Sequence, residues 1–194
     1  MRIDDDLAAV TEAIDRLVAA GPSAYASGAA IVDLQRQLAR FECVVTEATA
    51  EFDTWGEWAT DGARTAAAWV SARSNLPMKD ARRRVARARG LRQLPSCARA
   101  FANGDINVAH VDALVGLHRP RTEEALRRDE EMLLEQATTM PYRHFIRALS
   151  YWEQLADPDG TERAAQDQRD RRDAYLVPSI GGMFLGKMTL DRVS

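Results

Sequence analysis

Residues 31–52 read IVDLQRQLARFECVVTEATAEF, and the spacing of their apolar residues decides the fold class. Apolar side chains recur every three or four residues, at Ile31, Leu34, Leu38, Phe41, Val45, Ala48 and Phe52. This spacing predicts an α-helix of about six turns, with an apolar stripe of the kind that forms coiled coils. We therefore expect a mainly α-helical, multi-helix domain.

A second amphipathic helix precedes this one. The same spacing occurs at Leu7, Val10, Ile14 and Leu17. Three aspartates, Asp4 to Asp6, place negative charge where a helix N-terminus favours it. Because Gly21 and Pro22 then interrupt the pattern, we expect residues 1–54 to form a long antiparallel helical hairpin. Such stripes serve packing or pairing, so a homo-oligomer formed through these N-terminal helices is one expected partner.

The charge of the chain is concentrated in one segment. The 194 residues carry a net charge of −3, with 24 arginines and two lysines. Residues 64–99 hold ten basic side chains and one acidic one, so this segment is +9 while the rest of the chain is −12. A basic block in an otherwise acidic chain points to a polyanionic partner, and DNA is the partner that we expect.

The same region has the spacing of a helix-turn-helix protein. Within residues 62–118 we expect helices over Ala66–Arg73 and Met78–Leu91, with Pro77 at the start of the second. Pro95 opens a further helix that stops at Gly104, and Asn107 can cap the next. A helix, a tight turn and a helix thus occur twice, which is compatible with helix-turn-helix geometry.

The last part of the chain changes character. Residues 122–173 are expected to be helical and to complete a helical domain over residues 1–173, with eight or nine helices in all. Residues 174–194 read as a C-terminal β-hairpin. Since a lone hairpin is marginally stable and no element follows to cover it, we expect the sequence to be cut inside a larger protein.

The sequence offers no catalytic, cofactor-binding or metal-binding constellation. There is no nucleophile elbow, phosphate-binding glycine loop, His-Glu-x-x-His or Cys-x-x-Cys motif. Its histidines, His110, His118 and His144, are scattered, and Cys43 and Cys97 read as buried thiols. No segment is long and apolar enough for a membrane span or a signal peptide, so we expect a cytoplasmic protein without membrane contact.

Several short motifs resemble one family. They are Trp58-Ala59-Thr60-Asp61-Gly62-Ala63-Arg64-Thr65-Ala66-Ala67-Ala68-Trp69-Val70, Ala81-Arg82-Arg83-Arg84-Val85, Leu94-Pro95, Gly104-Asp105-Ile106-Asn107-Val108-Ala109-His110 and Gly182-Met183-Phe184-Leu185-Gly186-Lys187-Met188. In combination they are similar to the actinobacterial 13E12-repeat family, also called domain of unknown function 222 (DUF222). The resemblance covers roughly residues 5 to 190.

The resemblance implies a place in a larger protein. In that family the helical domain is typically followed by an HNH nuclease module, which holds a divalent cation and cleaves DNA. No residue here matches that module, so the implied metal and the catalytic residues would lie in a missing C-terminal module. The expected function is therefore that of a non-catalytic N-terminal domain of an HNH endonuclease-like protein, while the parent chain would be a metal-dependent endonuclease.

The residues expected to bind DNA are the arginines of the basic block. They are Arg73, Arg82, Arg83, Arg84, Arg87, Arg89, Arg92 and Arg99. The alternative is an interaction or oligomerisation domain without nucleic-acid contact, in which these arginines pair with acidic side chains such as Asp61, Glu123 or Glu124.

Overall fold

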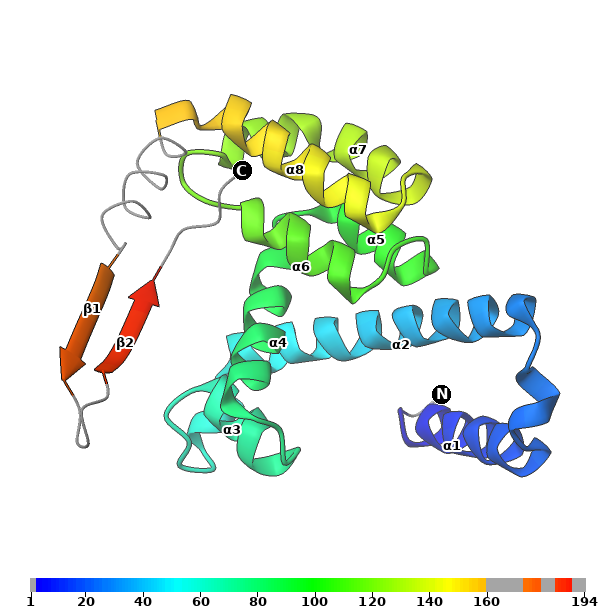
Figure 1. Ribbon diagram of the computed structural model, residues 1–194. Helices are drawn as coiled ribbons and strands as arrows, with labels where there is room; N and C mark the ends of the chain where they lie inside the picture. Colours follow the sequence, from blue (N-terminus) through cyan, green and yellow to red (C-terminus); the bar gives the residue numbers. More distant parts are fainter. Residues whose placement is uncertain (1–2, 160–172, 179–183, 190–194) are drawn as a thin grey trace. The chain divides into compact units, whose positions relative to one another are not determined.

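The computed structural model describes residues 3–159, 173–178 and 184–189. These residues form eight α-helices, two short 3-10 helices and two β-strands (Figure 1). The prediction of a mainly α-helical protein is confirmed. The chain divides into two compact units, Met1–Val111 and Asp112–Ser194.

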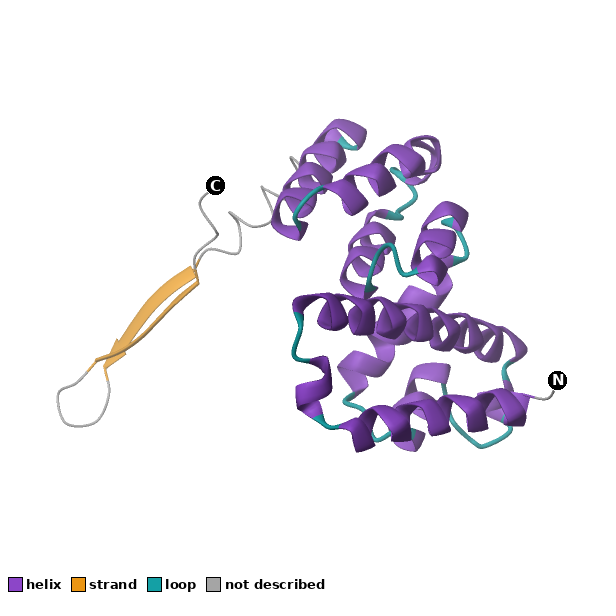
Figure 2. Cartoon of the chain, turned by 90° about the vertical axis from the view of Figure 1, so that its right-hand side faces the viewer, coloured by secondary structure: helices purple, strands orange, loops and turns teal. Residues whose placement is uncertain are grey.

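The first unit begins with two antiparallel helices. Helix α1 spans Ile3–Ala20, the 3-10 helix η1 spans Pro22–Tyr25, and α2 spans Gly28–Trp55. The side chain of Ser27 caps α2 by accepting a hydrogen bond from the amide of Ala30, at 3.2 Å. Both views show α1 running antiparallel to α2 (Figures 1 and 2), but α1 is not among the helices that pack on α2, so the paired hairpin over residues 1–54 stays a prediction.

The face that α2 buries is not the one with the large apolar residues. Helix α2 packs against α4 (Met78–Leu91) and α5 (Pro95–Asn103). Its buried side chains are small ones: Ala39, Cys43, Thr46 and Ala50. The expected seam is largely exposed instead, at Ile31, Leu34, Leu38 and Phe41. Small side chains let neighbouring helices approach closely, which explains why this stripe holds the core contact.

Two further helical segments lie between α2 and α4 in the chain. The 3-10 helix η2 spans Glu57–Ala59, and α3 spans Ala66–Arg73. A core cluster joins α3 to α4 through Ala66, Ala67, Ala81 and Val85, with Phe52, Trp58 and Val70 packed against it. The alanines on both helices keep α3 and α4 in close contact.

Helix α5 ends in a tight turn against α2. Gly104 adopts a left-handed conformation with φ of 75° and closes α5. Helix α6 spans Val108–Leu117, and the Asn107 side chain accepts a hydrogen bond from the Ala109 amide at 2.9 Å. Asn107 therefore caps α6 as predicted. Cys43 and Cys97 are both buried and free, also as predicted.

The second unit contains a pair of helices and a pair of strands. Helix α7 (Glu123–Thr139) contacts α8 (Tyr142–Ala156), and their buried side chains are Leu126, Leu133, Phe145, Leu149 and Trp152 among others. Strand β1 (Asp173–Pro178) pairs antiparallel with β2 (Phe184–Thr189), with Asp173 opposite Thr189.

Parts of the second unit lie outside the described residues. These are residues 160–172, the end of the segment 122–173 that is expected to be helical, and the residues 179–183 between the strands. The hairpin over residues 174–194 therefore stays a prediction as a whole.

Candidate nucleic-acid interface

Helices α3 and α4 are joined by a short turn, residues 74–77, of the length found in helix-turn-helix pairs. The hydroxyl of Ser71 donates to the carbonyl of Leu76 at 2.7 Å, and the amide of Leu76 donates to the carbonyl of Ser71 at 3.1 Å. Asn75 has a φ of 50°, a left-handed conformation that asparagine tolerates better than most residues. The turn is thus fixed by its own hydrogen bonds, and α4 follows as the second helix of the pair.

Helix α4 has one buried face. Its buried apolar side chains are Ala81, Val85, Ala88 and Leu91, and Arg87 is buried beside them with 8% of its surface exposed. These positions follow the spacing of three and four residues that places side chains on one side of a helix. The buried face packs on α2 and α3.

The opposite face of α4 is exposed and basic. Lys79, Arg82, Arg83 and Arg89 are all exposed, with Ala86 between them. Positions 79, 82, 83 and 86 are i, i+3, i+4 and i+7, and position 89 lies seven residues after 82, so they form one continuous face. We call Lys79, Arg82, Arg83 and Arg89 the outward basic face of α4.

Two of the predicted DNA-binding arginines are held by acidic residues of α2. Arg89 makes two hydrogen bonds to the carboxylate of Asp53, at 2.7 and 2.8 Å, and the Asp53 side chain is only 12% exposed. The hydrogen bond from Arg89 holds the pKa of Asp53 below its ordinary value, against the opposing effect of burial. Arg92 pairs with Glu51 at 3.0 Å and also donates to the hydroxyl of Thr54. These pairs fasten α4 and the residue after it to α2.

Arg73 and Arg83 also have acidic partners. Arg73 pairs with Asp61 at 3.3 Å and lies over the ring of Trp69, whose Nε1 donates to Asp61 at 2.7 Å. An arginine of the basic block thus pairs with Asp61, as the alternative expected, while the function that the alternative proposes stays a prediction. Arg83 pairs with Asp80, three residues earlier on the same helix, at 2.6 Å.

Three other predicted arginines differ in their surroundings. Arg84 lines a small depression against α2 together with Glu42, Thr46 and the buried Arg87. Arg99 is exposed on α5 and donates to the hydroxyl of Ser96 at 2.8 Å. Arg82 is exposed on the outward face, and none of the ion pairs within the described residues includes it.

The predicted acidic partners Glu123 and Glu124 lie at the start of α7. Glu123 pairs with Arg127 on its own helix at 3.0 Å. Acidic residues of α2, which the sequence analysis did not single out, pair with Arg89 and Arg92 instead.

Sequence reasoning missed one member of the outward basic face. Lys79 is not among the residues predicted to bind DNA, which are all arginines. The signal was available in the helical spacing, since position 79 precedes positions 82 and 83 by three and four residues.

The described residues show little that resembles a catalytic centre. Within them, no three histidine, cysteine or acidic side chains converge as metal ligands would. The ring of His110 lies 2.9 Å from the side-chain oxygen of Asn107, and burial lowers the pKa of this histidine. None of the described helices combines the length and the apolar character needed to cross a membrane.

Comparison with known proteins places the chain in a family. No curated protein and no solved structure matches it. Residues 28–190, from the first residue of α2 to just beyond β2, match the family described as Domain of unknown function (DUF222). This match covers most of the chain, and the protein therefore belongs to the DUF222 family.

Proposed function

We propose that this domain binds double-stranded DNA through the outward basic face of α4. One observation carries the proposal: a helix that follows a short, hydrogen-bonded turn presents Lys79, Arg82 and Arg83 together on its solvent side. In helix-turn-helix proteins the second helix enters the major groove, with its N-terminal residues near the bases. All three side chains lie in the first two turns of α4.

The dimensions of α4 suit a DNA backbone. From Lys79 to Arg89 the helix rises about 15 Å, which is enough to reach several phosphates. Ala86, in the middle of this face, is small and lets the helix approach the groove closely. The side chains of the outward face are long and reach phosphates on either side.

The ion pairs determine which arginines contribute most to the proposed DNA binding. An exposed pair such as Arg83 with Asp80 is worth only about 0–1 kcal/mol, so a phosphate competes with it easily. Arg89 is bound to a carboxylate with two hydrogen bonds, and its release would leave a mostly buried Asp53 without a cation. We therefore assign the main DNA contacts to Lys79, Arg82 and Arg83, with smaller contributions from Arg73, Arg84, Arg89, Arg92 and Arg99.

In this proposal the domain binds and does not cleave. It is the non-catalytic N-terminal domain of an HNH endonuclease-like protein of the cytoplasm, and hydrolysis belongs to an HNH module with its own divalent cation. The exposed basic face supports the DNA-binding part of this proposal.

The test is a titration of fluorescent duplex DNA at several salt concentrations. We expect the variant with Lys79, Arg82 and Arg83 all replaced by alanine to bind more weakly. The slope of log affinity against log salt should flatten by up to about 2.7, because each lost phosphate contact removes about 0.9. Circular dichroism and thermal unfolding of the variant verify that it stays folded.

A matched control removes the same charge elsewhere. Arg127, Arg143 and Arg147 are exposed on α7 and α8, and their joint replacement by alanine should leave the salt slope nearly unchanged. Equal losses in both triple variants would show that only net charge matters. No binding of the unaltered chain at low salt would contradict the proposal outright.

A further inference from the structure

Helix α1 has an apolar stripe that the structure leaves uncovered. None of the residues of α1 is buried. Leu7 and Ile14 are 51% and 52% exposed, and Leu17 on the same face is 39% exposed. A helix this amphipathic normally buries its apolar face, so the stripe calls for a partner surface.

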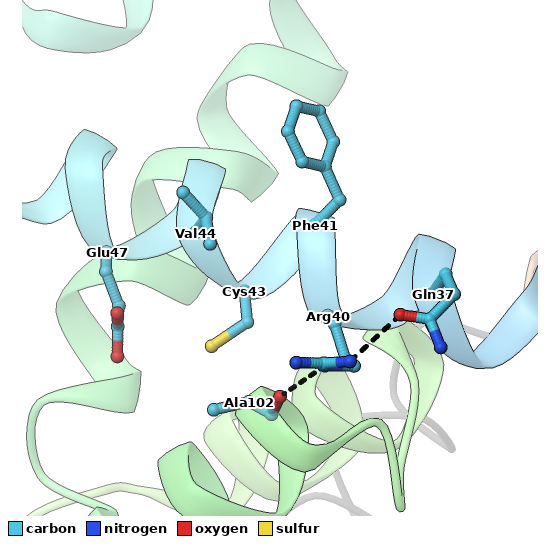
Figure 3. A pocket seen from close by; sticks show the side chains of 7 residues that line it. All are labelled: Gln37, Arg40, Phe41, Cys43, Val44, Glu47 and Ala102. Carbon is cyan, nitrogen blue, oxygen red and sulfur yellow. Dashed lines mark hydrogen bonds between the residues drawn. The ribbon is translucent and has the colours of Figure 1, made fainter. Parts of the chain in front are cut away.

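Helix α2 has a second apolar stripe on the side away from its core contacts. Ile31, Leu34, Leu38 and Phe41 are between 37% and 51% exposed. At 100° per residue, this stripe lies roughly 140° around the helix from Ala39, Cys43, Thr46 and Ala50. Figure 3 shows the same separation, because Cys43 points toward Ala102 of α5 while Phe41 points away from it.

The two stripes together make a large apolar area. We call Leu7, Ile14, Leu17, Ile31, Leu34, Leu38 and Phe41 the N-terminal apolar face. If the accessible surface of each whole side chain is about 200 Å², the exposed parts of these seven side chains add up to on the order of 600 Å². This is at the upper end of what a monomer leaves exposed, and it approaches the roughly 800 Å² that each partner contributes to a stable interface.

We infer that a second copy of this chain covers the N-terminal apolar face, so that α1 and the first half of α2 from two protomers form a four-helix bundle. The stripe on α2 has the three-and-four spacing of a coiled-coil seam, which a second identical helix can match in antiparallel orientation. In such a dimer a twofold axis relates the two chains, and each chain contributes the same patch to the interface.

None of the described residues covers this face. The helices that pack on α2 are α4 and α5, and the apolar stripes of both α1 and α2 stay exposed. None of the seven side chains is charged, and of the residues that flank the seam Gln35 and Gln37 are uncharged while Glu42, at its end, is charged. An interface with an uncharged centre avoids the cost of burying ions.

The experiment is sedimentation velocity on the full chain, without DNA, from about 1 to 100 µM. We expect a dimer of two 21.6 kDa chains. Leu38→Glu and Ile14→Glu should each raise the dimer dissociation constant by about a hundredfold. Each substitution is present in both chains, so the twofold-symmetric interface would bury two unpaired carboxylates. Circular dichroism verifies that the variants keep their helices.

Val32→Glu is the matched control. Val32 is an exposed apolar residue of the same helix, but it lies on the side opposite the seam. The dimer should survive this substitution. A monomer at every concentration, or a dimer that Leu38→Glu and Ile14→Glu do not weaken, would overturn the inference. The outcome is separate from the proposed DNA binding, since the variant lacking Lys79, Arg82 and Arg83 should still be a dimer.

Discussion

Gly104 closes α5 directly against the backbone of α2. A Cβ atom at this position would lie 2.6 Å from Cγ of Arg36 and 2.8 Å from the carbonyl oxygen of Arg36. Its φ of 75° is also a conformation that other residues avoid. Arg36 in turn donates to the carbonyl of Asn103 at 3.2 Å and pairs with Asp105 at 3.3 Å. The glycine therefore holds the turn against the backbone of α2.

We predict that Gly104→Ala destabilises the protein by about 2–4 kcal/mol. About 1 kcal/mol comes from the left-handed conformation, and about 1–3 kcal/mol comes from overpacking against Arg36. Gly62→Ala is the control, because Gly62 has the same φ, 76°, but open space around it. It should cost only about 1 kcal/mol. Urea unfolding measures both, and equal losses would mean that α2 moves aside without cost.

At the scale of elements, α7 and α8 are joined by a carboxylate. Asp129 of α7 accepts a hydrogen bond from Nε1 of Trp152 on α8, at 2.9 Å. It also accepts two from Arg128, at 2.7 and 2.8 Å. The hydrogen bonds from Arg128, and to a lesser extent that from Trp152, lower the pKa of Asp129 to about 2, although burial opposes this.

This lowered pKa predicts a specific pH dependence. Since the pKa is lower in the folded state than the roughly 3.9 of an unfolded aspartate, ionised Asp129 stabilises the fold above about pH 4. That contribution is lost as the pH falls toward 2. Asp129→Asn should therefore lower the free energy of unfolding at pH 7 and have little effect at pH 2. Glu131→Gln, at an exposed position of the same helix, should not change this part of the pH profile of urea unfolding.

The boundaries of the elements were largely predictable. The sequence predicted Ala66–Arg73 and Met78–Leu91, and the structure has the same bounds. Proline at a helix start, glycine at a helix end and an asparagine cap are local signals, so they survive whatever the tertiary contacts are. Which face of a helix is buried depends on its neighbours instead. Helix α2 has two apolar stripes, and the sequence favoured Leu38 and Phe41 where packing selected Ala39 and Cys43.

The candidate interface was predictable only in part, for the same reason. The basic block located it on α4, but Arg82 and Arg87 look alike in the sequence and differ in burial because α2 and α3 cover only one side of the helix. The acidic partners Glu51 and Asp53 lie 41 and 36 residues away along the chain from Arg92 and Arg89. Contacts of such long range leave no local pattern, so the sequence named other acids.

At the scale of the whole molecule, the acidic residues outside the basic segment determine which of its arginines stay available. Acidic residues of α2 neutralise the arginines that fasten α4, and the basic side chains left on the outward face keep the positive charge on which the proposed DNA binding depends. The chain can thus be acidic overall and still present a basic surface.

Dimerisation and DNA binding, taken together, lead to a last prediction. A dimer presents two α4 helices, as helix-turn-helix proteins do for two half-sites, so it makes twice as many phosphate contacts as a monomer. At a chain concentration where only the unaltered protein is dimeric, Leu38→Glu should therefore roughly halve the salt slope of DNA binding, although Leu38 lies on α2 and not on the basic face. Val32→Glu should keep the full slope in the same titration. If Leu38→Glu dissociates the dimer but leaves the slope unchanged, then each protomer binds DNA alone and the N-terminal apolar face serves assembly without regard to DNA.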